Sequence, residues 1–259
     1  MYQLRRISLF GLVLLLLAGC AQTPSGNSYI NEVGANGLPT PRALFARHVE
    51  ALGGEAVLRD HESTTLHGRF ILGGFGIEGD LTMRMAAPNL SSQLIEIPGL
   101  GQINAGYNGE VAWSVDPMQG SRILQGDALT DLLQQSDYYL PMNHEKLFES
   151  EATVGQITIA GAPAYHVELT DARGQDTHIY FSAESNRIVR TAATVSTPMG
   201  AVNVITHTEE YALFDGQWVA VAMSISQAGQ EFRIEVDEVS FNDVNDSHFS
   251  PPAEIQSQL

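Results

Sequence analysis

The sequence predicts an α+β fold that is mainly antiparallel β, in which one curled half-barrel sheet of about ten strands is covered by two or three helices. From Ser63 onward, apolar and polar residues alternate, which is the period of a half-buried strand. Asn108-Gly109 and Asp215-Gly216 stand between alternating runs, as in β-hairpins. Helical spacing of apolar residues occurs only before residue 63 and between residues 127 and 148.

The composition is that of an acidic globular protein. Of the 259 residues, 44% are hydrophobic, enough to build a core, and 30 Asp and Glu against 13 Lys and Arg give a net charge of −17. Because nucleic-acid binding needs a basic surface that neutralises phosphates, this composition argues against that class of function. The single cysteine, Cys20, excludes an intramolecular disulfide and a cysteine-based zinc cluster.

Residues 1–19 are predicted to be a signal peptide. Arg5 and Arg6 precede the apolar run Ile7 to Ala18, and this run of about 12 residues is shorter than the roughly 20 needed to span a bilayer. The run ends in Leu17-Ala18-Gly19-Cys20, which resembles the bacterial lipoprotein processing box. We therefore expect lipidation of Cys20; the alternative is an ordinary secretory signal in which Cys20 stands by chance.

Lipidation would anchor the protein to a membrane without a spanning helix. The residue after the cysteine is Ala21 and not Asp, so we expect outer-membrane attachment facing the periplasm. Residues 20–40 are rich in Gly, Ser, Asn and Pro and are predicted to be a lipidated flexible tether. The alternative for this segment is a short strand around Tyr29-Ile30.

Residues 41–259 are predicted to form a single domain. Thr40-Pro41 begins a helix with a break expected at Gly53-Gly54, and helical spacing returns from Asp127 to Tyr139 and near His144 to Phe148. The clearest alternating runs are residues 63–72, 81–85, 111–115, 165–170, 178–181, 202–213, 219–225 and 232–236.

The motifs that carry chemistry are incomplete. Gly74 to Gly79 matches G-x-G-x-x-G, but a strand pattern follows it where a nucleotide site needs a helix. The His-Glu pairs at His61 and His144 lack the second histidine of a zinc protease, and no G-x-S-x-G is present.

One polar cluster is predicted across two strands. His166, Glu168 and His178 share one face and could form a metal or acid/base site, and the alternative is a solvated polar face. The many carboxylates do not single out a catalytic pair. We therefore expect no enzymatic activity, no cofactor and no metal.

The predicted concave face of the sheet is apolar and rich in methionine, an adaptable side chain that suits varied apolar ligands. The alternative is an ordinary core packed on the helices. The residues expected to line a hydrophobic site are Phe70, Leu81, Met83, Met85, Trp113, Phe181, Met223, Ile225 and Phe232.

With these features in place, the sequence resembles the outer-membrane lipoprotein-sorting family of LolA/LolB-like proteins, in a branch distinct from the true carrier or receptor. The resemblance covers roughly residues 42–250. It is carried by Ala51-Leu-Gly-Gly54, Gly76-Ile-Glu-Gly-Asp80 with Ala87-Pro-Asn89, Gly106-Tyr-Asn-Gly109 to Trp113, Asp116-Pro-Met-Gln-Gly120, and Ile179-Tyr-Phe-Ser182 with Arg187-Ile-Val-Arg190.

The resemblance implies an incomplete antiparallel barrel, closed by helices over an apolar cavity that holds acyl chains. The expected function is binding of a lipid, a lipoprotein acyl chain or another hydrophobic ligand, in lipoprotein sorting or envelope lipid transport. The expected partners are the membrane, through the anchor, and a hydrophobic ligand or acylated protein. The alternative is a non-catalytic envelope interaction or assembly protein with a packed interior and an envelope protein as its partner.

Overall fold

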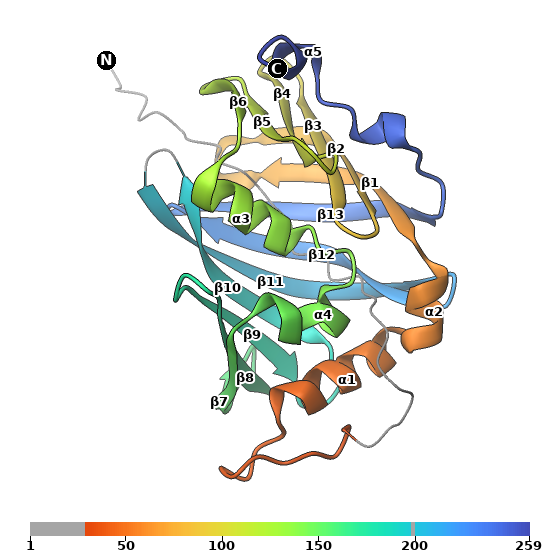
Figure 1. The fold of residues 1–259 in the computed structure, drawn as a ribbon, viewed down its shortest axis with the longest axis vertical. Helices are drawn as coiled ribbons and strands as arrows, with labels where there is room; N and C mark the ends of the chain where they lie inside the picture. Colours follow the sequence, from red (N-terminus) through yellow and green to blue (C-terminus); the bar gives the residue numbers. More distant parts are fainter. Residues whose placement is uncertain (1–28, 198–199) are drawn as a thin grey trace.

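Thirteen strands form one antiparallel sheet within residues 29–197 and 200–259, the residues that the computed structural model describes (Figure 1). The strand order is β6-β5-β4-β3-β2-β1-β13-β12-β11-β10-β9-β8-β7, so β6 and β7 are the two edges of an open half-barrel. The strands are β1 (Ser63–Leu72), β2 (Ile77–Ala86), β3 (Leu90–Ile97), β4 (Gly101–Tyr107), β5 (Ala112–Asp116), β6 (Gly120–Ile123), β7 (Ser150–Ile159), β8 (Ala162–Thr170), β9 (Asp176–Ser182), β10 (Ile188–Thr197), β11 (Gly200–Phe214), β12 (Gln217–Gln227) and β13 (Gln230–Phe241).

The α+β half-barrel predicted from the sequence is confirmed, with more strands than the estimated ten. Strands β3 and β6 have weak patterns because Gln93 and Arg122 occupy positions on the face where alternation expects apolar residues. Gly74 and Gly76 of the G-x-G-x-x-G match lie in a turn, where the short 3₁₀ helix η1 (Gly73–Phe75) leads into β2, and Gly79 lies within β2. No helix N-terminus follows these glycines, as predicted.

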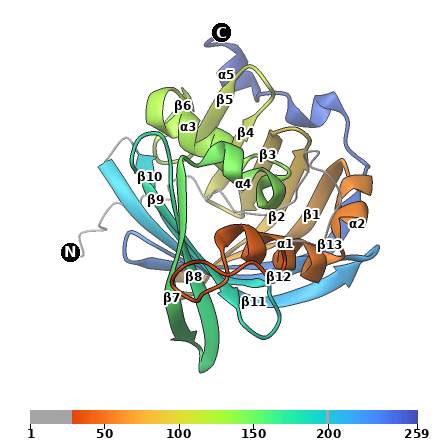
Figure 2. The same cartoon turned by 60° about the horizontal axis from the view of Figure 1, so that its bottom comes forward.

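Helices lie on the concave side of the sheet, as Figure 2 shows for α1 (Pro41–Leu52), α3 (Gly126–Gln135) and α4 (Leu140–Leu147). The Thr40 side chain caps α1 by accepting a hydrogen bond from the Ala43 amide at 3.2 Å. At the other end, Gly53 has φ +133° and a Cβ there would lie 2.4 Å from the Gly216 carbonyl oxygen, so α1 ends against the β11–β12 turn. A short helix, α2 (Glu55–Asp60), connects α1 to β1.

Two apolar clusters make up most of the core. The larger lies between strands β1 to β4, β12 and β13 and includes Phe70, Met83 and Ile234. The second packs Leu44 and Phe45 of α1 against strands β8 and β9. Helix α1 is therefore a structural cover over one half of the sheet.

Residues 29–40, the second part of the predicted tether, are held against the domain. Arg47 Nε donates to the Ile30 carbonyl oxygen at 2.6 Å, and Asn36 Nδ2 donates to the Thr153 carbonyl oxygen of β7 at 2.9 Å. The alternative of a strand at Tyr29-Ile30 is not found; in this segment an isolated bridge joins Val33 and Pro39. The predicted signal peptide (residues 1–19), Cys20 and the rest of residues 20–28 lie outside the described residues.

The C-terminal segment covers part of the sheet from the side opposite the helices. Its elements η2 (Asp246–Phe249) and α5 (Ala253–Gln256) contact β3 and β6, respectively, and bury Phe249 and Ile255 (Figure 1). Gln258 Nε2 donates to Ser121 Oγ at 3.0 Å. Among the described residues, no helix is both long and apolar enough to cross a membrane.

Candidate functional site

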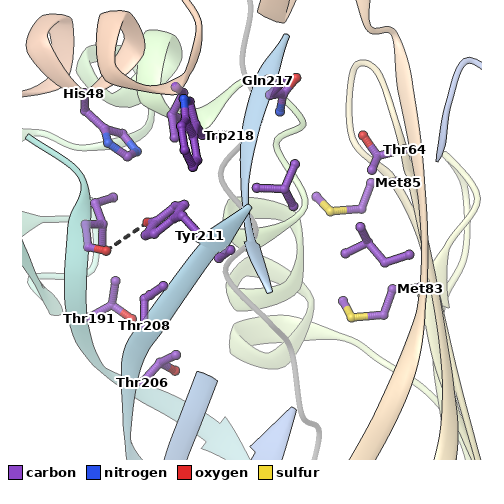
Figure 3. Close-up of a pocket in the computed structure, with 15 residues that line it drawn as sticks. His48, Thr64, Met83, Met85, Thr191, Thr206, Thr208, Tyr211, Gln217 and Trp218 are labelled. Carbon is purple, nitrogen blue, oxygen red and sulfur yellow. Dashed lines mark hydrogen bonds between the residues drawn. The ribbon is translucent and has the colours of Figure 1, made fainter. Parts of the chain in front are cut away.

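Two of the cavities formed by the described residues are candidate sites on the concave side of the half-barrel. The first, which we call the inner cavity, is enclosed by β1, β2, α1 and β10 to β12, and Figure 3 shows its lining side chains. Its volume is about 60 Å³. Since one water needs about 10–15 Å³ of such space, the inner cavity has room for a few waters and not for an acyl chain.

The wall of the inner cavity is uncharged. No Asp, Glu, Lys or Arg of the described chain lines it, and its one histidine, His48, has a pKa lowered to about 4 by burial. His48 Nδ1 lies 3.2 Å from the Asn186 carbonyl oxygen, which fits a neutral ring donating from Nδ1. At neutral pH the cavity therefore presents an apolar surface with neutral hydrogen-bonding groups.

Tyr211 forms the side of the inner cavity nearest β10. Its hydroxyl donates to the Ile188 carbonyl oxygen at 2.8 Å, the bond drawn in Figure 3, and burial raises the pKa of this phenol. Beside it, the Arg187 guanidinium lies 3.8 Å above the centre of the Trp218 ring. These contacts fix the aromatic part of the wall.

The second cavity, which we call the α3 cavity, is the larger, at about 430 Å³. Its lining residues come from α3, from β4 to β6 and from β10. Figure 1 shows α3 lying across the open side of the half-barrel. Its volume falls within the range of roughly 300–1,000 Å³ typical of small-molecule sites. Its apolar wall consists of Ala105, Ile123, Leu124, Ala128, Leu132 and Val195. Its polar wall consists of Ser114, Arg122, Gln125, Asp127, Asp131, Gln135, Ser196 and Thr197.

An ion-pair network holds α3 over this cavity. Arg173 Nη2, in the β8–β9 turn, lies 2.6 Å from Asp131 Oδ1 and 2.6 Å from Asp171 Oδ2. Asp131 Oδ2 also accepts a hydrogen bond from the Ser196 amide of β10 at 2.7 Å. Burial works against the charged form of Arg173, but the bonds to Asp131 and Asp171 outweigh it and raise the pKa of the guanidinium.

The structure separates the predicted hydrophobic-site residues. Met83 and Met85 line the inner cavity. Phe181 packs beneath α1, with its ring centre 5.1 Å from that of Phe45. The remaining predicted residues on the concave face belong to the larger core cluster and line neither cavity. They are Phe70, Leu81, Met223, Ile225 and Phe232.

Trp113 lies on the other face of the sheet, which corrects its predicted position on the concave side. Directly opposed residues of neighbouring strands share a face, and the pairings across β5, β4, β3 and β2 run from Trp113 through Gly106 and Ser92 to Arg84. Arg84 alternates with Met83 and Met85 on β2, so Trp113 points to the face opposite these methionines. A Cβ on Gly106 would lie 2.6 Å from the Trp113 ring. Trp113 is nevertheless fully buried, and the C-terminal segment packs on β3 and β6, the strands on either side of the β4–β5 pair.

The predicted polar cluster on β8 and β9 does come together. His166 Nε2 lies 3.1 Å from His178 Nδ1, and Glu168 Oε2 lies 3.7 Å from the same nitrogen. His166 and Glu168 alternate with the buried Val167 on β8, and His178 of β9 pairs with Glu168, so all three face away from both cavities. Partial burial, together with His178, lowers the pKa of His166. In the part of the chain that the structure describes, no three His, Cys, Asp or Glu residues are arranged to hold a metal ion.

Several wall residues were not predicted from the sequence. Ser114 and Arg122 of the α3 cavity stand on short strands, and their polar side chains are typical of an exposed face. His48, Tyr211 and Trp218 of the inner cavity come from three different elements. No local pattern connects residues that are so far apart in the sequence.

Comparisons with known proteins identify the fold. No protein-family model matches the sequence, and no curated protein matches it. A solved DUF1329 family protein from Desulfovibrio piger superposes with a TM-score of 0.55 at 12% identity, over 81% of this chain and 95% of that one. A LolA superfamily protein from Nitrosomonas europaea superposes with a TM-score of 0.54 at 13% identity, over 82% of this chain and 98% of that one. At these identities the likeness concerns the fold, and the chain has the LolA-like half-barrel fold that its motifs predicted.

Proposed function

We propose that the protein is a periplasm-facing lipoprotein that binds a lipid, a lipoprotein acyl chain or another hydrophobic ligand on the concave side of the half-barrel, without catalysis. The observation that carries the proposal is the α3 cavity, about 430 Å³ in volume, on the open side of the sheet. The LolA-like fold supports it by analogy, since the same architecture occurs in a LolA superfamily protein. The proposed anchor is Cys20, in the outer membrane.

The α3 cavity provides the main volume for the ligand. The inner cavity, at about 60 Å³, can receive an acyl chain only if its walls move apart. Met83 and Met85 in that wall are flexible side chains that can make room for a chain end. The ligand therefore enters beneath α3 and reaches toward the two methionines.

The test is mass spectrometry of organic extracts from the purified protein. The chain carries Cys20→Ser and is exported behind a cleavable signal peptide, so that no detergent is needed. We expect a stoichiometric lipid in the wild-type cavity and its loss in Ala128→Trp, which fills the α3 cavity from α3. The matched control is Thr130→Trp on the exposed side of the same helix, which should keep the lipid.

The second candidate, a non-catalytic envelope interaction protein, is favoured by the packing of the larger core cluster. Phe70, Met223 and Phe232 fill the space between their strands, with Phe70 and Phe232 ring centres 5.5 Å apart. If no lipid is extracted, and none binds after incubation with envelope lipids and acylated peptides, the ligand-binding proposal fails and this candidate replaces it.

A further inference from the structure

Three exposed apolar side chains stand at one end of the sheet. Phe75 lies in the β1–β2 turn, Leu100 in the β3–β4 turn and Met118 in the β5–β6 turn. Because consecutive hairpins of an antiparallel meander turn back at alternate ends, these three turns lie at the same end. The side chains are 56%, 52% and 54% exposed, respectively. We call residues 73–76, 98–100 and 117–119 the apolar rim.

The apolar rim contains no charged side chain. Its sequences are GGFG, PGL and PMQ, in a chain of which 17% is charged. At the opposite end of the sheet, the β4–β5, β9–β10 and β11–β12 turns contain Glu110, Glu184 and Asp215. The charged β8–β9 turn is engaged with α3 through Arg173 and is not part of the rim. Since moving a charged group out of water costs free energy, the apolar rim can enter a less polar medium at low cost.

The backbone of the apolar rim is partly closed on itself. In each turn an amide donates to the carbonyl oxygen three residues earlier: Gly76 to Gly73 at 3.4 Å, Leu100 to Ile97 at 3.0 Å and Gln119 to Asp116 at 3.2 Å. An amide that is already hydrogen-bonded does not lose a water partner when the turn leaves water. The exposed side chain of each turn can therefore be transferred without leaving this donor unpaired.

The spacing of the three side chains suits a fluid surface. Neighbouring strands are about 4.8 Å apart, so successive turns at one end lie roughly 10 Å apart and the apolar rim is roughly 20 Å long. A folded partner would need a separate pocket for each side chain. Lipid molecules rearrange around each side chain independently, so a bilayer needs no such match.

Carboxylates beside the apolar rim indicate which lipids fit. Asp80 and Glu96, a directly opposed pair on β2 and β3, are exposed next to the turns. The arginines on the same face, Arg69 and Arg233, are ion-paired with Glu235. These carboxylates repel an anionic head group and attract the ammonium group of a zwitterionic one.

We infer that the apolar rim rests on a bilayer of zwitterionic phospholipids, with Phe75, Leu100 and Met118 inserted at the boundary between head groups and acyl chains. This contact goes beyond the proposed anchor at Cys20, because the folded domain itself makes it, and it requires no ligand in the α3 cavity. The α3 cavity borders the same surface, since Gln119 of the rim accepts a hydrogen bond from Arg122 of the cavity wall at 3.2 Å.

The test is flotation of the protein with lipid vesicles. The exported Cys20→Ser protein cannot be acylated at position 20, so any binding comes from the rest of the chain. It is mixed with vesicles of phosphatidylcholine and phosphatidylethanolamine, and with vesicles that also contain phosphatidylglycerol. We expect weak, reversible binding to the zwitterionic vesicles, and less binding when phosphatidylglycerol is present, most clearly at low salt.

Substitutions assign the binding to the apolar rim. Phe75→Ser, Leu100→Ser and Met118→Ser should each weaken binding about tenfold, because each removes an apolar side chain from the lipid interface, and the triple variant should not float. The matched control replaces three similarly exposed apolar side chains elsewhere, in a triple variant that should float like the wild type: Val33→Ser, Val154→Ser and Leu213→Ser. Circular dichroism confirms folding, and the single variants decide the question if a triple variant is misfolded.

Fluorescence shows whether the turn itself enters the lipid. Leu100→Trp places an indole in the apolar rim, and its emission should shift to the blue with zwitterionic vesicles and be quenched by brominated phospholipid. Leu213→Trp, near the β11–β12 turn at the opposite end of the sheet, should show neither change. The two native tryptophans are the same in both proteins.

Three outcomes would overturn the inference. The first is no flotation of the wild type with zwitterionic vesicles, or better flotation with phosphatidylglycerol. The second is equal binding by the two triple variants. The third is a dimer in sedimentation that the rim substitutions abolish, which would make the apolar rim a contact between copies of the chain. Each of these leaves the hydrophobic-ligand proposal standing, because lipid extraction tests the cavity and not the rim.

Discussion

Asp131 of α3 and Arg173 of the β8–β9 turn form an ion pair, with 2.6 Å between Asp131 Oδ1 and Arg173 Nη2. The same carboxylate accepts the Ser196 amide of β10, so one buried side chain joins α3 to two parts of the sheet. The α3 cavity lies directly beside this junction. The position of α3 over the open side of the half-barrel therefore depends on Asp131.

Replacing Asp131 should destabilise the protein. Asp131→Ala removes the partner of the Ser196 amide and one of the carboxylates around Arg173, and we expect a loss of about 2 kcal/mol in the free energy of unfolding. Urea denaturation measures this change in the free energy of unfolding. The control is Asp127→Ala, on the same helix and 66% exposed, which should cost less than about 0.5 kcal/mol. Equal effects of the two substitutions would contradict the role given to Asp131.

Removing the unpaired amide of Gln93 should stabilise the ligand-free protein. Gln93→Met keeps the side-chain length and deletes a buried nitrogen that has no partner among the described residues, so we expect a gain of about 1 kcal/mol. For a domain of this size, the gain corresponds to a rise in Tm of about 2–4 °C, measured by calorimetry. Gln102→Met, at an exposed site, should leave Tm unchanged. A lower Tm for Gln93→Met would mean that the amide is bound within the native fold.

The buried His48 should make stability dependent on pH. Its pKa falls from 6.5 to about 4 on folding, so the unfolded chain binds more protons than the native protein between these values. The contribution of His48 is complete above pH 6.5 and is lost as the pH falls from 6.5 toward 4. Between pH 7 and pH 5 the loss is about 2 kcal/mol.

The comparison of His48→Gln with the wild type isolates this effect. Urea unfolding at pH 7 and pH 5 should show a smaller drop in stability for His48→Gln than for the wild type, because the variant has no ring to protonate. The control, His67→Gln, replaces an exposed histidine and should keep the wild-type drop. An unchanged drop in His48→Gln would show that other groups account for the pH dependence.

Cys20 should decide where the protein resides. In a bacterium that processes lipoproteins, the wild-type protein should incorporate labelled palmitate. The labelled protein should be recovered in the outer-membrane fraction. Cys20→Ala should lose the label completely, because the substitution removes the acylated thiol. Palmitate in the Cys20→Ala protein, or recovery of the wild type in the inner membrane, would contradict the predicted lipidation or the predicted destination, respectively.

Local patterns in the sequence determined the elements of this fold. Thr40-Pro41 and Gly53 predicted the two ends of α1, since a capping side chain and a positive φ act within one turn of the helix. Alternation and the Asp215-Gly216 turn predicted the antiparallel strands, because successive side chains of a strand point to opposite faces. The LolA-like resemblance rested on short stretches of this kind.

The tertiary structure alone decided which face of each strand is concave and what covers it. On β5, alternation separates Trp113 from Ser114 but does not say which face is covered by apolar groups. The C-terminal segment, more than a hundred residues away in the sequence, covers the side of Trp113 and leaves Ser114 in the wall of the α3 cavity. Burial of a strand face depends on such long-range contacts, so the polar part of the cavity wall that Ser114 and Arg122 form became visible only in the folded sheet.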